Sequence, residues 1–369
     1  MPDDDNVVPI NQQGGWQRDK QGAIKSVLHN SVFALNRLRH RFSFNVFKHR
    51  FLVTFADGDT REIDDYVISD LYHEIYHHFD FDPTEKHLCT AYKMLCRQHQ
   101  FHPVIDYLDH LKWDGVERLS SWLETVFGVE PTPLSIAVAR IQLIAAVRRA
   151  RHPGCKHDAA VIFVSETQGR GMSEAIAILA VDPDWFSDSE LLGERSKEQI
   201  EAMQGKWIVE LCELSGAKRT EIEKLKAFIS RQEDRARLAW HHTSMPYRRT
   251  CVFFGTTNDP KPLRDRTGNR RFWLFKVNGK VDKKWLLDNR DQLWAEAAEA
   301  EGKRESIILP EHLWDTAARM QAEHVPDDPW VDILAHGSRA KRVTYSPAPF
   351  WTRRLASAKA INHSSTAFT

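Results

Sequence analysis

The sequence predicts an α/β domain built on a mainly parallel sheet, with helical regions before and after it along the chain. Three short, continuously apolar runs carry this prediction: residues 159–165 (AAVIFVS), 207–211 and 250–255. Runs of this kind are typical of strands that are buried on both faces. Helical stretches separate the runs, and strands alternating with helices at this spacing indicate parallel pairing.

Composition places the chain among ordinary globular proteins. Its 369 residues are 42% hydrophobic and 28% charged, which allows two or three domains. Lys plus Arg equals Asp plus Glu at 51 each, so a site for a polyanion has to be a local patch. The start lacks the apolar core of a signal peptide, and the best apolar run, IAVARIQLIAAV, is too short to span a bilayer. The five cysteines form no CxxC pair, as in reduced thiols, and we expect a cytoplasmic protein with no membrane partner.

The region before the α/β domain is predicted to be mostly helical. A basic helical pattern runs from Lys25 to Arg50, and FLVTFADGDTREI then alternates like a hairpin around Asp57-Gly58. A second helix is expected from Thr84 to Gln98. Between them, one apolar helix face is formed by residues four apart: Val67, Leu71, Ile75 and Phe79.

Helices also flank the predicted sheet. One runs from Leu134 to Arg151 and stops at His152-Pro153-Gly154, and residues 283–324 are helical again. From Gly337 onward there are six basic residues and no acidic one, which is typical of a disordered tail. The predicted division is a leader at 1–24, a helical accessory domain at 25–100, a connector and helix at 101–157, the α/β core at 158–280, a helical lid at 281–335 and a basic tail at 336–369.

The segment after the first strand partly matches a phosphate-binding loop. Such a loop needs glycines whose N–H groups wrap the phosphates, a Lys, and a Ser or Thr for Mg²⁺ at a helix N-terminus. The chain reads ETQGRGMS at 166–173, before the helix SEAIAILA. Aligned on GxxxxGK[ST], Gly171 and Ser173 match, whereas Glu166 replaces the first Gly and Met172 replaces the Lys. Taken alone, the loop also fits an ordinary strand–turn–helix connection.

Polar residues that an ATPase requires follow the next two strands. A carboxylate after one strand would hold Mg²⁺ and polarise water, an amide after the next would orient that water, and a later guanidinium would reach a nucleotide in a neighbouring subunit. Each group also has a plainer interpretation as a solvated strand end or surface turn, so their order along the chain carries the prediction. The candidates are Glu210 and Glu213, then Asn258 with Thr256 and Thr257, then Arg270 and Arg271.

Nine separated blocks of the chain resemble the virulence-associated E family of phage, plasmid and genomic-island proteins, which are primase-helicase-like. In order they read HPVIDYLDHLKWDGVERL, HPGCK, ETQGRGMS, WFSDS, GKWIVELCEL, KAFISRQEDR, FFGTTND, LRDRTGNRRFW and DQLWAEA. The resemblance covers roughly residues 25–335. It implies a P-loop NTPase core of the AAA+ or superfamily 3 helicase type, used in DNA replication of a mobile element.

The resemblance also implies ligands and partners. These are ATP with Mg²⁺, single-stranded DNA, a homo-oligomer in the form of a hexameric ring, and a primase or other replication proteins of the element. In the nucleotide site it assigns the loop to Gln168, Gly169, Arg170, Gly171, Met172 and Ser173, and the Mg²⁺ ligands to Ser173 and Glu210. It assigns the catalytic carboxylates to Glu210 and Glu213, the polar sensor to Asn258, and the finger and sensor arginines to Arg270 and Arg271. The DNA phosphates would be contacted by Lys226, Arg231, Arg235 and Arg237, with Trp240 available for base stacking.

The loop departs from the family pattern GxQGxGKS in two places. Glu166 brings a negative charge close to the phosphates, and Met172 removes a cation. By analogy with the loss of one preorganised donor, hydrolysis is expected to fall by at least about 10²–10³-fold. Arg170 is expected to point away from the phosphates, which leaves Lys156 as a candidate replacement. The alternative is a catalytically silent ring subunit that binds DNA or a partner.

One further motif suggests a different enzyme class. His73-Glu74-Ile75-Tyr76-His77 matches HExxH, the helical motif of zinc metalloproteases. That reading needs a third ligand from elsewhere in the fold. The alternative is a pair of solvent-facing histidines on a helix of the accessory domain.

Overall fold

The computed structural model describes residues 15–167, 169–189, 196–211, 219–236, 245–263 and 269–326. Within these ranges the chain forms two mixed α/β regions with separate hydrophobic cores. No helix in these ranges is long and apolar enough to cross a membrane. The four cysteines that they contain, Cys89, Cys96, Cys155 and Cys251, are unpaired.

The N-terminal region combines helices with a small sheet. Its strands have the order β3-β2-β1-β4, in which β1 pairs antiparallel with β2 and parallel with β4. The predicted hairpin is confirmed, because Thr54 pairs with Thr60 across a turn in which Gly58 has a φ of +93°. The elements are α1 (Leu28–Arg37), β1 (Arg41–Asn45), β2 (Arg50–Thr54), β3 (Thr60–Glu62), α2 (Asp65–Phe79), α3 (Glu85–Gln98) and β4 (Gln100–Phe101).

The helical prediction for this region was wrong in one place. The basic pattern from Lys25 to Arg50 ends its helix at Arg37. Strand β1 follows, because RFSFN pairs with β2 along its whole length and buries Phe42 and Asn45. The other two helices are confirmed. Val67, Leu71 and Ile75 are buried on α2, and Thr84 caps α3 by accepting from the His87 N–H.

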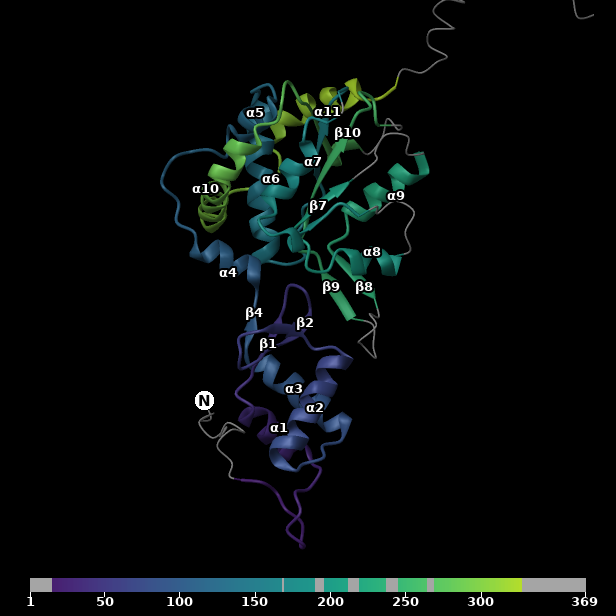
Figure 1. The fold of residues 1–369 in the computed structure, drawn as a ribbon. Coiled ribbons are helices and arrows are strands. Elements are labelled where there is room, and N and C mark those ends of the chain that lie inside the picture. The colour runs from purple at the N-terminus through teal and green to yellow at the C-terminus, as the bar shows by residue number, and fades with distance from the viewer. Residues whose placement is uncertain are drawn as a thin grey trace, which may run out of the picture. The chain divides into compact units, whose positions relative to one another are not determined.

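The second region is organised around a five-stranded parallel sheet (Figure 1). The strand order is β11-β5-β10-β7-β6, so β10 lies between β5 and β7. All three predicted apolar runs are strands of this sheet. The strands are β5 (Ala160–Val164), β6 (Phe186–Ser187), β7 (Ile208–Leu211), β10 (Val252–Thr257) and β11 (Phe272–Lys276).

Helices bury both faces of this sheet, which explains why its strands are continuously apolar. One face, which includes Phe163, Ile208 and Phe254, packs against α5, α6, α7 and α10, while the other packs against α9 (Figure 1). Helix α11 packs against the edge strand β11 and contacts the hydrophobic clusters of both faces. The helices are α4 (Pro103–His110), α5 (Trp122–Phe127), α6 (Pro133–Arg151), α7 (Met172–Leu179), α8 (Ser196–Ala202), α9 (Arg219–Ile229), α10 (Lys283–Gly302) and α11 (Trp314–Glu323); a separate two-stranded hairpin consists of β8 (Glu233–Ala236) and β9 (Met245–Arg248).

The predicted connector and lid belong to the same core as the sheet. The cluster on the α7 face extends from Val104 in α4 to Ala317 in α11 and contains most of the buried side of α6. Helix α6 buries even Gln142 and Arg149, whose side chains donate to the backbone carbonyls of Phe253 on β10 and of Cys251 just before it. The boundaries drawn at residues 158 and 280 therefore cut through one packed core.

Candidate functional site

Three side chains from different elements meet at one edge of the large sheet. Glu210 on β7 accepts two hydrogen bonds at Oε1, one from the Ser173 hydroxyl and one from the Thr256 hydroxyl, each 2.7 Å long. Ser173 belongs to the first turn of α7, and Thr256 lies near the end of β10. The pairing joins the loop helix to the strand carboxylate that the sequence singled out.

The strand register explains why these residues meet. Glu210 pairs with Phe254 across β7 and β10, so their side chains share a face, and Thr256 lies two residues further along on that same face. Helix α7 packs on this face through Ala175, Ile176 and Leu179. Because parallel strands end at a common edge, the start of α7 lies directly beside Glu210.

Glu210 is buried and has unused hydrogen-bonding capacity. Its side chain is 0% exposed, and its Oε2 atom has no hydrogen-bond partner among the described residues. A buried carboxylate oxygen without a partner is costly unless a cation, water or ligand satisfies it. Carboxylate and hydroxyl oxygens are ligands that Mg²⁺ prefers, and the pair Ser173 and Glu210 therefore fits that ion.

The loop before α7 has the backbone shape of an anion site. Gly169 and Gly171 both have positive φ, at +75° and +81°, a conformation that glycine adopts without strain. Gly171 is the N-cap of α7, and no side chain caps the helix there. The first N–H groups of a helix have no acceptor within the helix, and the dipole favours negative charge at this end.

Charged side chains surround the loop. The Glu166 carboxylate lies 3.8 Å from Lys276 Nζ, and both side chains are 68% exposed. The Arg170 guanidinium donates to the Gly279 carbonyl, so it is engaged away from the start of α7. On α10, Lys283 pairs with Glu174 in the first turn of α7.

The remaining sequence candidates lie in different places. Asn258 is exposed just after β10, at the same edge as Glu210. Arg270 and Arg271 come just before β11, at the opposite edge, where Arg271 donates to Ser230 Oγ at 2.6 Å. Lys156 also precedes its strand, β5, and lies 3.6 Å from Asp158, so it is at the wrong edge to replace the loop lysine. Gln168 and Glu213 lie outside the described residues.

The predicted DNA-contacting stretch contains the end of α9 and the first strand of the β8–β9 hairpin. Lys226 differs from the expectation of a solvent-facing cation, because its side chain is 4% exposed and donates to Glu223 at 2.9 Å. It packs on the apolar side of α9. Arg231 and Arg235 are 42% and 76% exposed, and each pairs with a neighbouring carboxylate. Arg237 and Trp240 lie outside the described residues.

The HExxH match lies on α2, in the N-terminal region. The rings of His73 and His77 lie side by side on the helix, with centroids 4.2 Å apart and their planes tilted by 59°. Glu74, the acid/base residue of that motif, instead accepts a hydrogen bond at Oε2 from His40 Nε2, at 2.8 Å. Across the ranges that the structure describes, no three His, Cys, Asp or Glu side chains are grouped to hold a metal ion.

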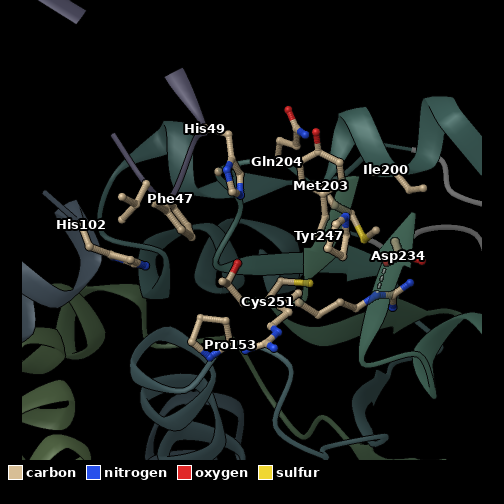
Figure 2. A pocket seen from close by; sticks show the side chains of 16 residues that line it. Phe47, His49, His102, Pro153, Ile200, Met203, Gln204, Asp234, Tyr247 and Cys251 are labelled. Carbon is tan, nitrogen blue, oxygen red and sulfur yellow. Dashed lines mark hydrogen bonds and ion pairs between the residues drawn. The ribbon is translucent and has the colours of Figure 1, made fainter. Parts of the chain in front are cut away.

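A cavity of about 410 Å³ lies away from this site (Figure 2). Phe47, His102, Met203, Tyr247 and Cys251 are among the side chains around it, whereas the three residues that meet at Glu210 are not. Its buried ion pair is internal, since Arg249 Nε donates to Asp234 Oδ2 at 2.7 Å and the two side chains are 2% and 3% exposed. The cavity is mainly apolar, although Arg248 and His49 also line it.

Comparison with known proteins places this geometry in a family. The virulence-associated protein E-like domain matches residues 108–326. No curated protein matches the sequence significantly. Among solved structures, the apo C-terminal region of NrS-1 (305–718) is similar at a TM-score of 0.51 and 13% identity, covering 80% of this chain and 74% of that one. A second apo form of that region is similar at 0.49 and 12%, covering 79% and 74%, and the JCV helicase at 0.27 and 11%, covering 69% and 78%.

Proposed function

Because this chain belongs to the virulence-associated protein E-like family, we propose that it is an ATP-binding protein of the P-loop type that acts in the DNA replication of a mobile element. In this proposal, the observed parallel sheet is the centre of an AAA+ or superfamily 3 helicase-type core. The observation that carries it is the meeting of Ser173, Glu210 and Thr256 beside the start of α7.

The proposed division of labour follows from the side chains. The N–H groups at the start of α7 and the glycine backbone bind the phosphates of ATP. Ser173 and Glu210 hold Mg²⁺, which when bound neutralises charge on the phosphate oxygens. Thr256 keeps the Glu210 carboxylate oriented by donating to Oε1. Asn258, exposed at the same edge, orients the attacking water. Glu213, which lies outside the described residues, is assigned as a second carboxylate by resemblance alone.

The arginines fit a role between subunits. Arg270 and Arg271 precede β11 and so lie at the edge opposite Glu210 in their own chain. Neither can serve the site of its own subunit from there. We propose that one of them reaches the nucleotide of a neighbour, in a homo-oligomeric ring for which six subunits are expected by resemblance.

The proposed protein moves along single-stranded DNA. The exposed guanidinium of Arg235 on the β8–β9 hairpin, together with Arg231, offers cations for backbone phosphates. The chain has no net charge to recruit DNA globally, so the contact has to be local. A primase or another replication protein of the element is the proposed partner.

The two substitutions in the loop favour a second candidate, a ring subunit that binds nucleotide or DNA without turnover. Met172 lies where a cation is needed, and Glu166 adds a negative charge beside the loop. Both changes weaken stabilisation of the transferred phosphate and leave the fold intact. Slow or absent hydrolysis with retained binding is the property that separates this candidate from an active motor.

ATP turnover in the presence of Mg²⁺ and single-stranded DNA tests the proposal. We expect the double variant Met172→Lys with Glu166→Gly to hydrolyse ATP about 10²–10³-fold faster than the natural chain. Adding Glu210→Gln to that variant should abolish the gain, since the carboxylate that holds Mg²⁺ is lost. The proposal fails if the folded double variant neither binds nor hydrolyses ATP.

A further inference from the structure

A lysine from another part of the chain lies across the loop where the usual loop lysine is missing. A Cβ atom added at Gly171 would be 3.4 Å from Lys283 Cδ and 3.5 Å from Lys283 Nζ. The ammonium therefore lies beside the N-cap of α7, next to the backbone that would wrap the phosphates. Met172, the residue that replaces the loop lysine, follows Gly171 directly and packs its side chain on the core instead.

The position of Lys283 is fixed by the fold. It is the first residue of α10, and the N-cap Asp282 accepts from the Trp285 N–H at 2.9 Å. The Asp282 N–H in turn donates to the Val126 carbonyl at 2.9 Å, which attaches the start of α10 to α5. The ammonium therefore reaches the loop from a rigid base.

Helix α10 also packs against the C-terminal end of α7. The indole N–H of the fully buried Trp294 donates to the Leu179 carbonyl at the end of α7, at 2.9 Å. Trp294 also contacts Trp207, with ring centroids 4.1 Å apart. Because both ends of α7 contact α10, the distance between Lys283 and Gly171 does not depend on a mobile loop.

Lys283 already binds an anion in the structure. Its Nζ pairs with the Glu174 carboxylate in the first turn of α7, while its own side chain is 33% exposed. The other nearby cations are less well placed, since Lys276 pairs with Glu166 at 68% exposure and Arg170 is bonded to the Gly279 carbonyl. Glu174 thus occupies the ammonium that a phosphate would use.

We propose that Lys283 is the phosphate-binding cation of this site and replaces the missing loop lysine, exchanging the Glu174 carboxylate for the β- and γ-phosphate oxygens of a bound nucleoside triphosphate. This inference rests on the proposed function, because it concerns the same loop. With this role for Lys283, α10 is part of the nucleotide site. The Lys283 side chain then both binds phosphate and connects α10 to α7.

Calorimetric titration of the full chain with ATP and Mg²⁺ tests this assignment. We expect Lys283→Gln to weaken binding by about 10- to 100-fold, the usual effect of losing a charge-assisted hydrogen bond. The matched control is Lys284→Gln, which makes the same change of charge at the next residue. Lys284 is 85% exposed and pairs with Asp288 within α10, so that variant should bind within about twofold of the natural chain.

Two further variants separate a binding role from a structural one. If Lys283 only stabilised the fold through its ion pair, Glu174→Gln would weaken binding as Lys283→Gln does. If Lys283 binds phosphate, Glu174→Gln frees the ammonium and removes a like charge from the ligand, so binding should tighten by about threefold or more. Met172→Lys in the Lys283→Gln background should restore binding, because it returns a cation to the same backbone.

The outcomes distinguish this inference from the proposed function. Equal binding by Lys283→Gln and Lys284→Gln overturns the role of Lys283 and leaves the nucleotide site in place. Binding by the Met172→Lys with Glu166→Gly variant but not by the natural chain also overturns it, since Lys283 would then not substitute. If no variant binds ATP while all are folded by circular dichroism, the nucleotide site itself is refuted and Lys283 with it.

Discussion

Individual buried polar residues divide into two kinds in this protein. Arg149 and His157 are almost fully buried and bond to the fold: both terminal nitrogens of Arg149 donate, to the carbonyls of Cys251 and His157, and the His157 ring lies 3.1 Å from Gln142 Oε1. The Arg149 Nε atom has no partner among the described residues. Glu210 is equally buried but keeps one oxygen without a partner among the described residues. The first kind stabilises the packing of α6 on the sheet, whereas Glu210 is the position proposed above for Mg²⁺.

His157 gives the protein an acid-sensitive core. Burial, together with the Arg149 charge, lowers the pKa of His157 from 6.5 to about 3. The unfolded chain therefore binds a proton below pH 6.5 that the folded chain does not, so the free energy of unfolding falls by up to ~1.4 kcal/mol per pH unit as the pH drops from about 6.5 towards 3. Urea denaturation at several pH values should show that His157→Gln flattens this slope. The control variant His312→Gln, at an exposed histidine, should retain the pH dependence of the natural chain. If His157→Gln also retained it, the assignment to His157 would be wrong.

At the scale of elements, the start of α10 depends on a close backbone contact. Gly128 ends α5 with a φ of +63°, and a Cβ there would lie 2.1 Å from the Asn278 carbonyl oxygen. The Asn278 N–H donates to the Phe127 carbonyl, and its amide donates to the Gly128 carbonyl at 3.1 Å. This contact holds the segment between β11 and α10, and thereby Lys283.

A pair of glycine substitutions separates backbone conformation from close approach. Gly279 also has a positive φ, at +83°, but nothing lies within 4 Å of a Cβ built on it. Gly279→Ala should therefore cost only ~1–2 kcal/mol for the left-handed conformation. Gly128→Ala should cost a further ~1–3 kcal/mol because the Asn278 carbonyl has to move. Equal midpoints of the two variants in thermal or urea unfolding would rule out the contact.

At the scale of the whole molecule, the N-terminal and C-terminal regions have separate hydrophobic cores. One core gathers Leu71, Leu88 and their neighbours, and another gathers Leu143, Ile144 and the α7 face of the large sheet. Separate cores allow separate opening reactions, because each region buries its own apolar surface.

Hydrogen exchange on two matched variants tests this separation. Leu71→Ala and Leu143→Ala each remove the same atoms from a site that is 0% exposed, at a cost of about 2–5 kcal/mol. Leu71→Ala should speed amide exchange in α2 and α3 and leave β5 and β10 protected. Leu143→Ala should do the reverse. Faster exchange across both regions in either variant would mean that they unfold as one unit.

The elements that the sequence predicted well are those whose signal is local. The three apolar runs became β5, β7 and β10, and the four-residue spacing of Val67, Leu71 and Ile75 became the buried face of α2. The segment that was predicted wrongly, Arg41–Asn45, is a strand only because β2 and β4 pair with it. Pairing with distant residues leaves a weak trace in a five-residue window.

The candidate site divides in the same way. The order of loop, carboxylate, polar strand end and arginine pair is written along the chain, and it led to Ser173, Glu210 and Asn258 without the structure. The structure decided that Lys226 is buried, that Lys156 lies at the opposite edge of the sheet, and that Glu210 keeps an oxygen without a partner among the described residues. Burial and position relative to a sheet edge are properties of packing, which local sequence does not contain.

By itself the sequence determined the fold class, the family and the residues of the loop, because each depends on residue types at short spacing. Only the tertiary structure brought Lys283, the cation that we propose for that loop, next to it. Lys283 and Glu174 are 109 positions apart, Lys283 precedes the block DQLWAEA in its helix, and nothing in the residues near Met172 points to it. The physical reason is that an ammonium acts through space, so its partner is chosen by the packing of α10 on α7 and not by its place in the chain.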